Sequence, residues 1–402
     1  MDKQQEPRLR FKGFTGAWEC KKLGEISTSY SGGTPIVGNA KFYGGTIPFI
    51  RSGEIHSSKT ELFLTQEGLE NSSTKLVKKG DILYALYGAT SGEVGRSQID
   101  GAINQAILAI IPKENYKAEF ISQWLKINKE NIVSLYLQGG QGNLSGEIVK
   151  KIEISFPSSK EQTHLGLFFR RLDSQIAESR AVLEKSRQLK KAMLAKMFPA
   201  NGEKIPKIRF KGFAGEWESR KLGIEVEIIG GGTPDTTNSA YWNGDIDWYS
   251  PTEIGEAAYA NGSVKKITLL GLQKSSAQIL PANRTVLFTS RASIGDMAIL
   301  TRDGATNQGF QSFVVGERLD VYFLYTMGFK IKDYALKNAS GSTFLEISKN
   351  TLSQMEFFAP SLKEQTAIGN FFRQLDETIA LQSAEVEKLN QLKKGLLAAM
   401  LV

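Results

Sequence analysis

One 13-residue segment occurs twice, and this repetition constrains the fold more than any other feature. Residues 7–19 read PRLRFKGFTGAWE and residues 206–218 read PKIRFKGFAGEWE, with nine of 13 positions identical at an offset of 199 residues. Solenoid units are about 20–50 residues long, so this period does not indicate a solenoid. It predicts two tandem copies of a whole domain with its connector, and two copies of a binding domain imply two copies of a target.

The correspondence continues along both halves of the chain. The turn sequence Gly-Gly-Thr-Pro occurs at 32–35 and again at 231–234. The amide pair Asn-Gln occurs at 104–105 and 307–308, where the offset has grown to 203. The second copy therefore carries four additional residues in its middle.

The part of each copy that precedes its last segment has the pattern of a mixed α/β domain. Residues 82–87 and 286–289 are rich in β-branched and aromatic residues, and residues 106–111 form an apolar run, so all three ranges are expected to be strands. Residues 120–131 have the apolar spacing of a helix. Glycines separate these segments, as tight connections require.

Each copy ends in a long segment with coiled-coil spacing. Seam positions recur in alternating steps of four and three, and no proline interrupts them. Twelve apolar seam residues are expected to pair the helices or contact partners: Leu165, Phe169, Leu172, Ile176, Leu183, Met193, Ile368, Phe372, Leu375, Ile379, Val386 and Leu396. Polar residues at matched seam positions, such as Lys190 and Lys393, can fix the register. The alternative is that each helix packs only on its own domain.

These patterns predict an α+β fold with two tandem α/β domains, each followed by a long helix. The two helices are expected to pair as an antiparallel coiled coil with pseudo-twofold symmetry. The predicted domains are 1–158 and 199–361, of which 199–206 is a linker, and the predicted helices are 159–198 and 362–402. About 40 residues at 1.5 Å each make a rod of roughly 55–60 Å.

Charge and cysteine content restrict the partners and the compartment. The formal net charge is +8, and the whole excess lies in residues 1–198, which hold 28 basic and 20 acidic residues. An excess of basic residues favours a polyanionic partner, although a merely soluble basic protein is the alternative. A single cysteine, Cys20, excludes an internal disulfide, and no apolar run of signal-peptide or membrane-spanning length occurs. We therefore expect a cytoplasmic protein with no membrane partner.

The sequence contains little that indicates catalysis. It has no phosphate-binding loop, no Gly-x-Gly-x-x-Gly and no Gly-x-Ser-x-Gly motif. The two histidines, His56 and His164, have no counterparts in the other copy, and one cysteine cannot build a zinc cluster. We therefore expect no catalytic residue, no metal site and no bound cofactor.

Polar loops that differ between the copies are the expected DNA-binding segments, because two readers should differ where they contact bases. The candidates lie in or beside these loops: Thr34, Tyr87, Thr90, Ser91, Gln138, Gln141, Asn143, Thr233, Ser290, Arg291, Ser293, Ser340, Ser342 and Thr343. The paired amides at 104–105 and 307–308 suit adenine edges. Since both copies keep them, a structural role is favoured. The aromatic boxes around Trp18 and Trp217 are likewise expected to attach each domain to its helix rather than to stack on bases.

Taken together, these motifs resemble the specificity subunit of type I restriction–modification systems over essentially the whole chain. The resemblance rests on the Arg-Phe-x-Gly-Phe-x-Gly-x-Trp-Glu boxes, the Gly-Gly-Thr-Pro turns and the Asn-Gln pairs. It also rests on a Pro-x-x-x-Glu-Gln-Thr run before each long helix, at 157–163 and 360–366. All of these features occur twice and in the same order.

The resemblance implies two target-recognition domains that read the halves of a bipartite double-stranded DNA site with a fixed spacer. It implies that the helices pair as that spacer and also bind two modification (methyltransferase) subunits. Restriction (endonuclease and translocase) subunits would join through the modification subunits, and the partners would hold S-adenosylmethionine, ATP and Mg²⁺. Two rival interpretations stay open. One is a self-sufficient nuclease or methyltransferase, and the other is a coiled-coil scaffold that binds protein or glycan ligands.

Overall fold

The structure is a computed structural model that describes residues 6–137, 144–200, 202–255, 257–341 and 345–401. Its residues fall into two compact units. Unit 1 is drawn from Met1–Glu178 and Val386–Val402, and unit 2 from Ser179–Glu385. Each unit therefore contains one globular domain together with a part of both long helices. We call the globular part of unit 1 domain 1 and that of unit 2 domain 2.

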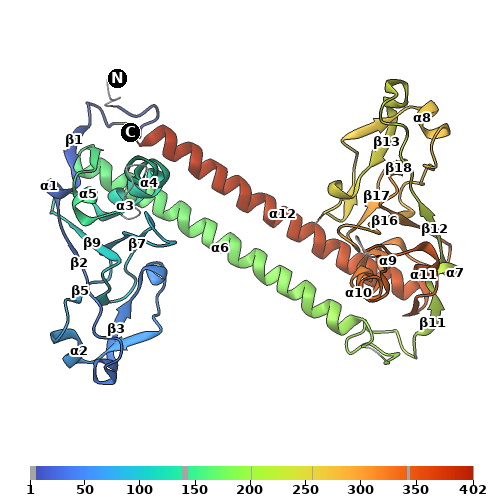
Figure 1. Cartoon of the computed structure of the whole chain (residues 1–402), viewed down its shortest axis with the longest axis horizontal. Coiled ribbons are helices and arrows are strands. Elements are labelled where there is room, and N and C mark those ends of the chain that lie inside the picture. The colour runs from blue at the N-terminus through green and yellow to red at the C-terminus, as the bar shows by residue number, and fades with distance from the viewer. Residues whose placement is uncertain (1–5, 138–143, 201, 256, 342–344, 402) are drawn as a thin grey trace. The chain divides into compact units, whose positions relative to one another are not determined.

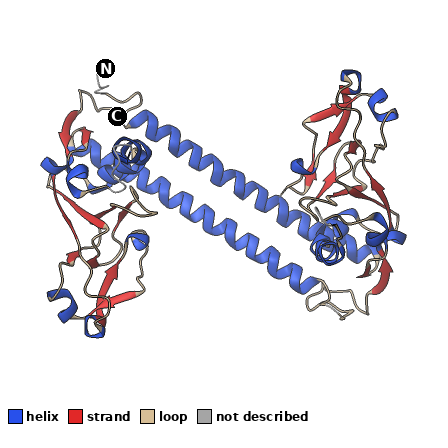
Figure 2. Cartoon of the chain, viewed as in Figure 1, coloured by secondary structure: helices blue, strands red, loops and turns tan. Residues whose placement is uncertain are grey.

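Domain 1 is built from short strands and short helices (Figures 1 and 2). Its strands are β1 Glu19–Lys22, β2 Ser27–Ser31, β3 Tyr43–Ile50, β4 Leu62–Leu64, β5 Lys75–Val77, β6 Ile82–Ala85, β7 Val94–Arg96, β8 Gly101–Ile103, β9 Ile107–Pro112 and β10 Glu153–Phe156. Its α-helices are α1 Leu23–Ile26, α2 Gln66–Glu70, α3 Ala118–Ile127, α4 Lys129–Leu137 and α5 Gly146–Lys150. The strands form an antiparallel sheet of order β2-β9-β6-β7, a mixed sheet of order β4-β3-β8-β5, and the pair β1-β10.

Domain 2 repeats this plan. Its strands are β11 Glu218–Lys221, β12 Val226–Gly230, β13 Trp242–Tyr249, β14 Tyr259–Ala260, β15 Lys265–Ile267, β16 Thr285–Phe288, β17 Met297–Leu300, β18 Gly304–Thr306, β19 Gln311–Val315 and β20 Glu356–Ala359. Its α-helices are α7 Leu222–Glu225, α8 Leu269–Gln273, α9 Val321–Thr326, α10 Gly328–Asn338 and α11 Lys349–Ser353. The sheets have the orders β12-β19-β16-β17-β14, β15-β13-β18 and β11-β20.

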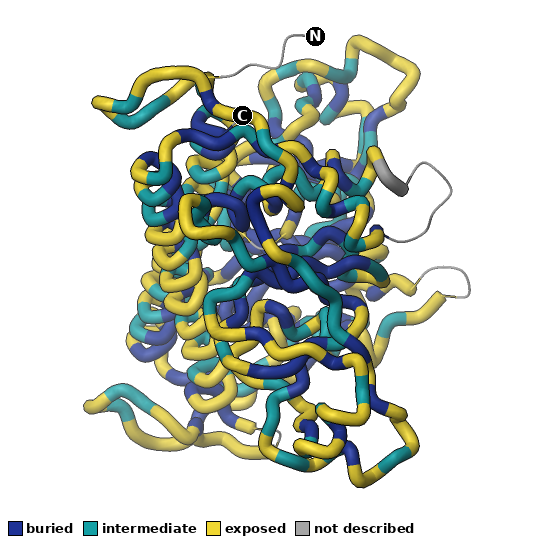
Figure 3. The backbone as a smooth tube through the Cα atoms, turned by 90° about the vertical axis from the view of Figure 1, so that its left-hand side faces the viewer, coloured by how far each residue is buried: buried dark blue, intermediate teal, exposed yellow. Residues whose placement is uncertain are grey.

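The apolar runs form the central strands, as predicted. Every residue of β6 and of β16 is buried, which is what a strand between two other strands and beneath helices requires. In Figure 3 the buried backbone segments lie mostly toward the middle of the view, and exposed segments lie around them. The single helix expected over 120–131 is instead two helices. Asn128 ends α3, and its side-chain amide donates to the carbonyl of Trp124 at 3.0 Å, so the helical pattern restarts at α4.

The two long helices predicted from the seam pattern are present. Helix α6 covers Ser159–Met197 and α12 covers Leu362–Met400. All twelve predicted apolar seam residues are buried or half-buried. In unit 1, Leu397 and Met400 of α12 share a core cluster with Phe169 of α6, and in unit 2, Met197 shares one with Phe372. The alternative in which each helix packs only on its own domain is therefore wrong.

Candidate nucleic-acid interface

Three loops of domain 1 meet at one edge of its antiparallel sheet. Because β2 runs antiparallel to β9, and β9 to β6, the end of β2, the start of β9 and the end of β6 lie at the same edge. Backbone hydrogen bonds join the loops there: Gly33 donates to Ile103 at 3.2 Å, and Leu86 donates to Ala106 at 2.8 Å. We call residues 32–35, 86–91 and 104–106 loop cluster 1.

Domain 2 brings the corresponding loops together. Gly232 donates to the carbonyl of Thr306 at 2.8 Å, and Ser290 donates to that of Gly309 at 2.8 Å. We call residues 231–234, 289–294 and 307–309 loop cluster 2. An additional segment joins this cluster, because Ile347 donates to the carbonyl of Ser290 at 3.0 Å.

The glycines of the Gly-Gly-Thr-Pro turns are required by close backbone contact. A Cβ atom on Gly32 would lie 1.8 Å from the carbonyl oxygen of Ile103, and one on Gly231 would lie 2.0 Å from that of Asn307. Such a position admits no side chain. Each turn is therefore pressed against the strand connection that carries the Asn-Gln pair.

The Asn-Gln pairs hold these turns in place, which agrees with the favoured structural interpretation. Asn104 Oδ1 accepts from the backbone of Ala106 at 3.2 Å, and Asn307 Oδ1 accepts from that of Gly309 at 2.8 Å. The neighbouring glutamines, Gln105 and Gln308, hydrogen-bond the hydroxyl groups of the turn threonines at 34 and 233. Those two threonines, predicted as DNA contacts, lie in the clusters but already have an internal partner.

The remaining candidates of loop cluster 1 are half-buried. Tyr87 packs against the core of domain 1, while Thr90 lies in the same loop. The hydroxyl of Ser91 donates to the carbonyl of Leu86 at 3.2 Å. The predicted contacts Gln138, Gln141 and Asn143 lie outside the described residues. Leu144, just beyond them, donates to Leu86 at 3.0 Å.

In loop cluster 2 the candidates differ in their access to solvent. Ser290, a predicted DNA contact, is fully buried just beyond the end of β16. Arg291 is half-buried, and Ser293 and Ser340 are exposed. Ala292 has φ of 61°, a left-handed conformation that strains a residue with a side chain. The predicted contacts Ser342 and Thr343 lie outside the described residues.

The box and Glu-Gln-Thr motifs form a charged anchor between each domain and its own long helix, a role that the sequence did not reveal. Arg10 Nε and Nη2 each lie 2.7 Å from a carboxylate oxygen of Glu161, and Arg209 binds Glu364 in the same bidentate way at 2.6 and 2.7 Å. The two carboxylates are almost completely buried. Only the recurrence of Arg in both boxes and of Glu before both helices could have indicated the pairing.

The next residue of the motif anchors a different part of each domain. Gln162 donates to the carbonyl of Pro157 at 2.9 Å and accepts from the backbone of Lys117 at 3.0 Å. Gln365 makes the matching contacts with Pro360 and Asp320. The aromatic boxes belong to the same anchor, because their tryptophans at 18 and 217 are buried in the two cores. This confirms the structural interpretation of the boxes.

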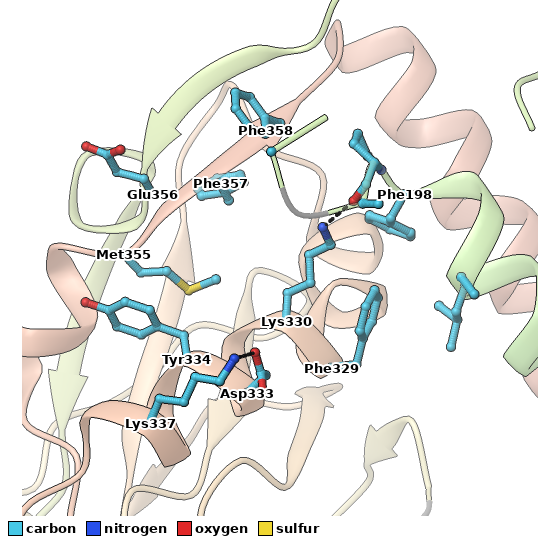
Figure 4. Close-up of a pocket in the computed structure, with 15 residues that line it drawn as sticks. Phe198, Phe329, Lys330, Asp333, Tyr334, Lys337, Met355, Glu356, Phe357 and Phe358 are labelled. Carbon is cyan, nitrogen blue, oxygen red and sulfur yellow. Dashed lines mark hydrogen bonds and ion pairs between the residues drawn. The ribbon is translucent and has the colours of Figure 1, made fainter. Parts of the chain in front are cut away.

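One pocket of domain 2 lies beside the linker rather than at the loops. A pocket of about 590 Å³ lies between the end of α6, helix α10 and strand β20, and aromatic side chains such as Phe198 and Phe329 line it (Figure 4). Lys330 donates to the carbonyl of Pro199 at 2.6 Å across it. Burial lowers the pKa of Lys330. The hydrogen bond from Lys330 and the packing of Phe198 therefore hold the chain in place where it leaves α6.

Neither metal ligation nor membrane insertion is indicated in the part of the chain that the structure describes. No group of three or more histidine, cysteine, aspartate or glutamate residues is arranged to hold a metal ion within the described ranges. Among the helices of those ranges, none is both long enough and apolar enough to cross a bilayer.

The chain thus consists of two similar domains whose scaffolds match and whose loops after β6 and β16 carry different polar side chains. Comparison with known proteins gives the family. The chain belongs to the type I restriction modification DNA specificity domain family, whose model matches residues 16–185 and 214–391. These two matched ranges contain one loop cluster each.

Individual relatives agree with this assignment. The chain is 33% identical over 194 residues to the type I restriction enzyme MjaIX specificity subunit of Methanocaldococcus jannaschii, a match that covers 47% of this chain and 43% of the relative. It spans less than half the length of that relative. The MjaVIII specificity subunit of the same organism matches at 21% identity over 96% of this chain and 92% of the relative. The crystal structure of a type I restriction–modification S subunit from M. genitalium shares the fold, with a TM-score of 0.67 and 15% identity over 99% of both chains.

Proposed function

We propose that the chain is the DNA-recognition subunit of a type I restriction–modification complex, in which each loop cluster reads one half of a bipartite site. The supporting observation is that the two domains keep the same scaffold, anchors and turns but carry different side chains at most positions of the loops that follow β6 and β16. Arg291 in loop cluster 2, for example, stands where loop cluster 1 has Gly88. Arginine is the commonest side chain in specific contacts to guanine.

The chain supplies recognition, and its partners supply chemistry. Modification subunits would bind S-adenosylmethionine and methylate adenine, and restriction subunits joined through them would use ATP and Mg²⁺ to cleave DNA. Two modification subunits fit a chain with two equivalent domain-and-helix copies. The complex acts on DNA in the cytoplasm.

The long helices are proposed to pair as an antiparallel coiled coil and to set the number of unread base pairs between the half-sites. Each helix has 39 residues, which corresponds to a rod of about 58 Å. Deleting one heptad from each helix is therefore expected to change the gap. Mapping of methylated adenines would measure it, and an unchanged gap would contradict this role.

The same mapping tests the function. Cells carrying this chain and its partner subunits are expected to show adenine methylation at a split site with a fixed gap. Exchange of residues 1–158 for another domain of the family is expected to change one half-site only. The matched control exchanges residues 199–361 and should change the other half-site. A change of both half-sites in either exchange would contradict separate reading.

Binding and turnover assays with the purified protein distinguish a DNA-recognition subunit from a scaffold and from an enzyme. A DNA complex that weakens steeply with added salt and strengthens with the modification subunit is expected, because cationic groups release counterions from phosphates. A scaffold for proteins or glycans would give no such complex. Turnover of DNA by the isolated chain with Mg²⁺ and S-adenosylmethionine would instead indicate an enzyme.

A further inference from the structure

Asp173, on α6, joins three elements of unit 1. Its Oδ2 accepts a hydrogen bond from Nε2 of Gln123 on α3 at 2.7 Å. Its Oδ1 lies 2.5 Å from the ammonium of Lys393 on α12. One carboxylate therefore holds its own domain with one oxygen and the other long helix with the second.

Asp376, at the matching position of α12, does the same in unit 2. Its Oδ2 accepts from the hydroxyl of Tyr322 on α9 at 2.9 Å, and its Oδ1 lies 2.5 Å from the ammonium of Lys190 on α6. Burial, and then the charge of Asp376, raise the pKa of Tyr322, so the hydroxyl keeps its proton and remains a donor. The domain donor has changed from Gln to Tyr, but the ion pair to the other helix is the same.

The residue numbers of the two ion pairs agree with a single helix register. In antiparallel helices, facing positions have a constant sum of residue numbers. Asp173 with Lys393 gives 566, and Lys190 with Asp376 also gives 566. Two ion pairs, one in each unit, thus agree with the same antiparallel alignment.

A shifted alignment would leave these charges without partners. The four side chains are only 13% to 32% exposed. A shift of one turn would place Asp173 beside Leu389 or Leu396, and Lys190 beside Phe372. A half-buried charge against apolar side chains is strongly unfavourable, whereas an apolar seam alone tolerates such a shift.

We propose that Asp173, Lys190, Asp376 and Lys393 form a register lock, which admits one antiparallel alignment of α6 and α12 and ties each domain to that alignment through Gln123 and Tyr322. These are positioning residues. Their effect on the gap between half-sites rests on the proposed function, but their effect on helix pairing does not.

Two charge exchanges with identical composition test the lock. K190D/D376K exchanges the charges within one pair and keeps both attractions. K190D/D173K makes the same kinds of substitution but places Lys opposite Lys393 and Asp opposite Asp376. Each variant loses one hydrogen bond to a domain, from Tyr322 in the first and from Gln123 in the second, so the two differ chiefly in helix pairing. The second variant is expected to melt at least about 5 °C below the first, as followed by circular dichroism.

A milder set keeps the test decisive if a charge exchange prevents folding. K190Q/D376N neutralises one whole pair, whereas K190Q/D173N leaves one unpaired charge in each unit. The second is expected to melt lower than the first. Equal melting temperatures in both sets would overturn the lock, whatever DNA is methylated.

Methylation mapping adds the consequence for DNA. K190D/D376K is expected to keep the gap of the unchanged chain, and K190D/D173K to lose methylation at least tenfold or to alter the gap. A K190D/D173K chain that methylates with an unchanged gap and rate would overturn the positioning role. If even the unchanged chain directs no adenine methylation, the proposed function fails, while the ranking of melting temperatures still decides the lock.

Discussion

Domain 1 and domain 2 are alike where they meet their helices and in the Gly-Gly-Thr-Pro turns and Asn-Gln pairs of their loop clusters, and they differ in the loops that follow β6 and β16. The anchoring pairs Arg10–Glu161 and Arg209–Glu364 agree in partners, geometry and burial. The loops that follow β6 and β16 differ at most positions: half-buried Tyr87 corresponds to buried Ser290, and exposed Gly88 corresponds to half-buried Arg291. A recognition domain can change its specificity only if its loop residues can be substituted without unfolding it. That is possible when other residues, here the anchors, attach the domain to its helix. The comparison therefore predicts large and equal effects at the anchors, and smaller, domain-specific effects at the loops.

Replacing the anchor arginines should cause the largest losses of stability, and the losses should be equal in the two domains. Replacing Arg10 by Ala leaves the carboxylate of Glu161 buried without a partner, which is expected to destabilise domain 1 by about 3–5 kcal/mol. Replacing Arg209 by Ala should cost domain 2 as much. Unfolding in denaturant measures both, with the exposed Arg8→Ala as the control. Adding Glu161→Gln should restore part of the loss, because it removes the buried charge. Unequal losses at the two anchors would break the equivalence.

A substitution in the Gly-Gly-Thr-Pro turn should cause the second largest loss of stability. A methyl group at Gly32 would collide with the carbonyl of Ile103, so Gly32→Ala is expected to destabilise domain 1 by about 3 kcal/mol and to displace loop cluster 1. Gly38→Ala is the matched control, because an added Cβ there meets nothing within 4 Å. Hydrogen exchange at residues 103–107 would show the displacement. A harmless substitution at Gly32 would mean that the turn is not pressed against the strand connection.

Sequence patterns predicted what depends on local periodicity. The seam spacing predicted both long helices, and the apolar runs predicted the central strands. The patterns did not predict contacts between residues far apart in sequence. Arg10 and Glu161 are separated by 151 positions, and both residue types are usually found on surfaces. The core position of Ser290 escaped notice for the same reason, because a serine after a strand resembles a loop residue until the covering segment at 347 is known.

The base-reading residues could not be derived from sequence at all. Candidates were chosen because they differ between the copies, and difference alone does not separate a buried residue from an exposed one. In the structure Ser290 is buried and Ser293 is exposed. The hydroxyl groups of the turn threonines are hydrogen-bonded to Gln105 and Gln308. The structure also identifies the partners of the polar seam residues Lys190 and Lys393, each of which pairs with a carboxylate on the opposite helix.

Lowering the pH should destabilise domain 1 more than domain 2, and we expect this effect to be smaller than those at the anchors and at the turn. Burial tends to raise the pKa of Glu54, but hydrogen bonds from Arg51 and from backbone amides outweigh it and lower the pKa from 4.5 to about 2. Domain 2 has Ser250 in place of Arg51, and the matching Glu253 accepts from that serine instead. A charged arginine beside the carboxylate is thus a property of domain 1 alone.

The sign of the acid effect follows from the direction of that shift. A lowered pKa in the folded state contributes stability that is present above about pH 4.5 and is lost as pH falls towards 2. The full contribution is on the order of 2–3 kcal/mol. Between pH 6 and pH 3, the unchanged chain should therefore lose more of the stability of domain 1 than E54Q does. E253Q is the control, and an identical pH slope for the unchanged chain and E54Q would remove this difference between the domains.

The smallest effect is expected at the loops, and it should be confined to one half-site. Arg291 is half-buried in loop cluster 2, next to the strained Ala292, where loop cluster 1 has a glycine. Removing one good base or phosphate contact costs about 1–2 kcal/mol, so Arg291→Ala should weaken binding about tenfold while leaving stability unchanged. Arg302→Ala removes the same charge at the opposite end of the β16–β17 pair and is the matched control. Binding to sites with either half altered would locate the loss. If Arg291→Ala relaxes discrimination in the half-site read by domain 2 only, the loops act separately on a shared scaffold. If it affects both half-sites, or if Arg302→Ala weakens binding as much, the difference between the loop clusters does not encode the sequence that is read.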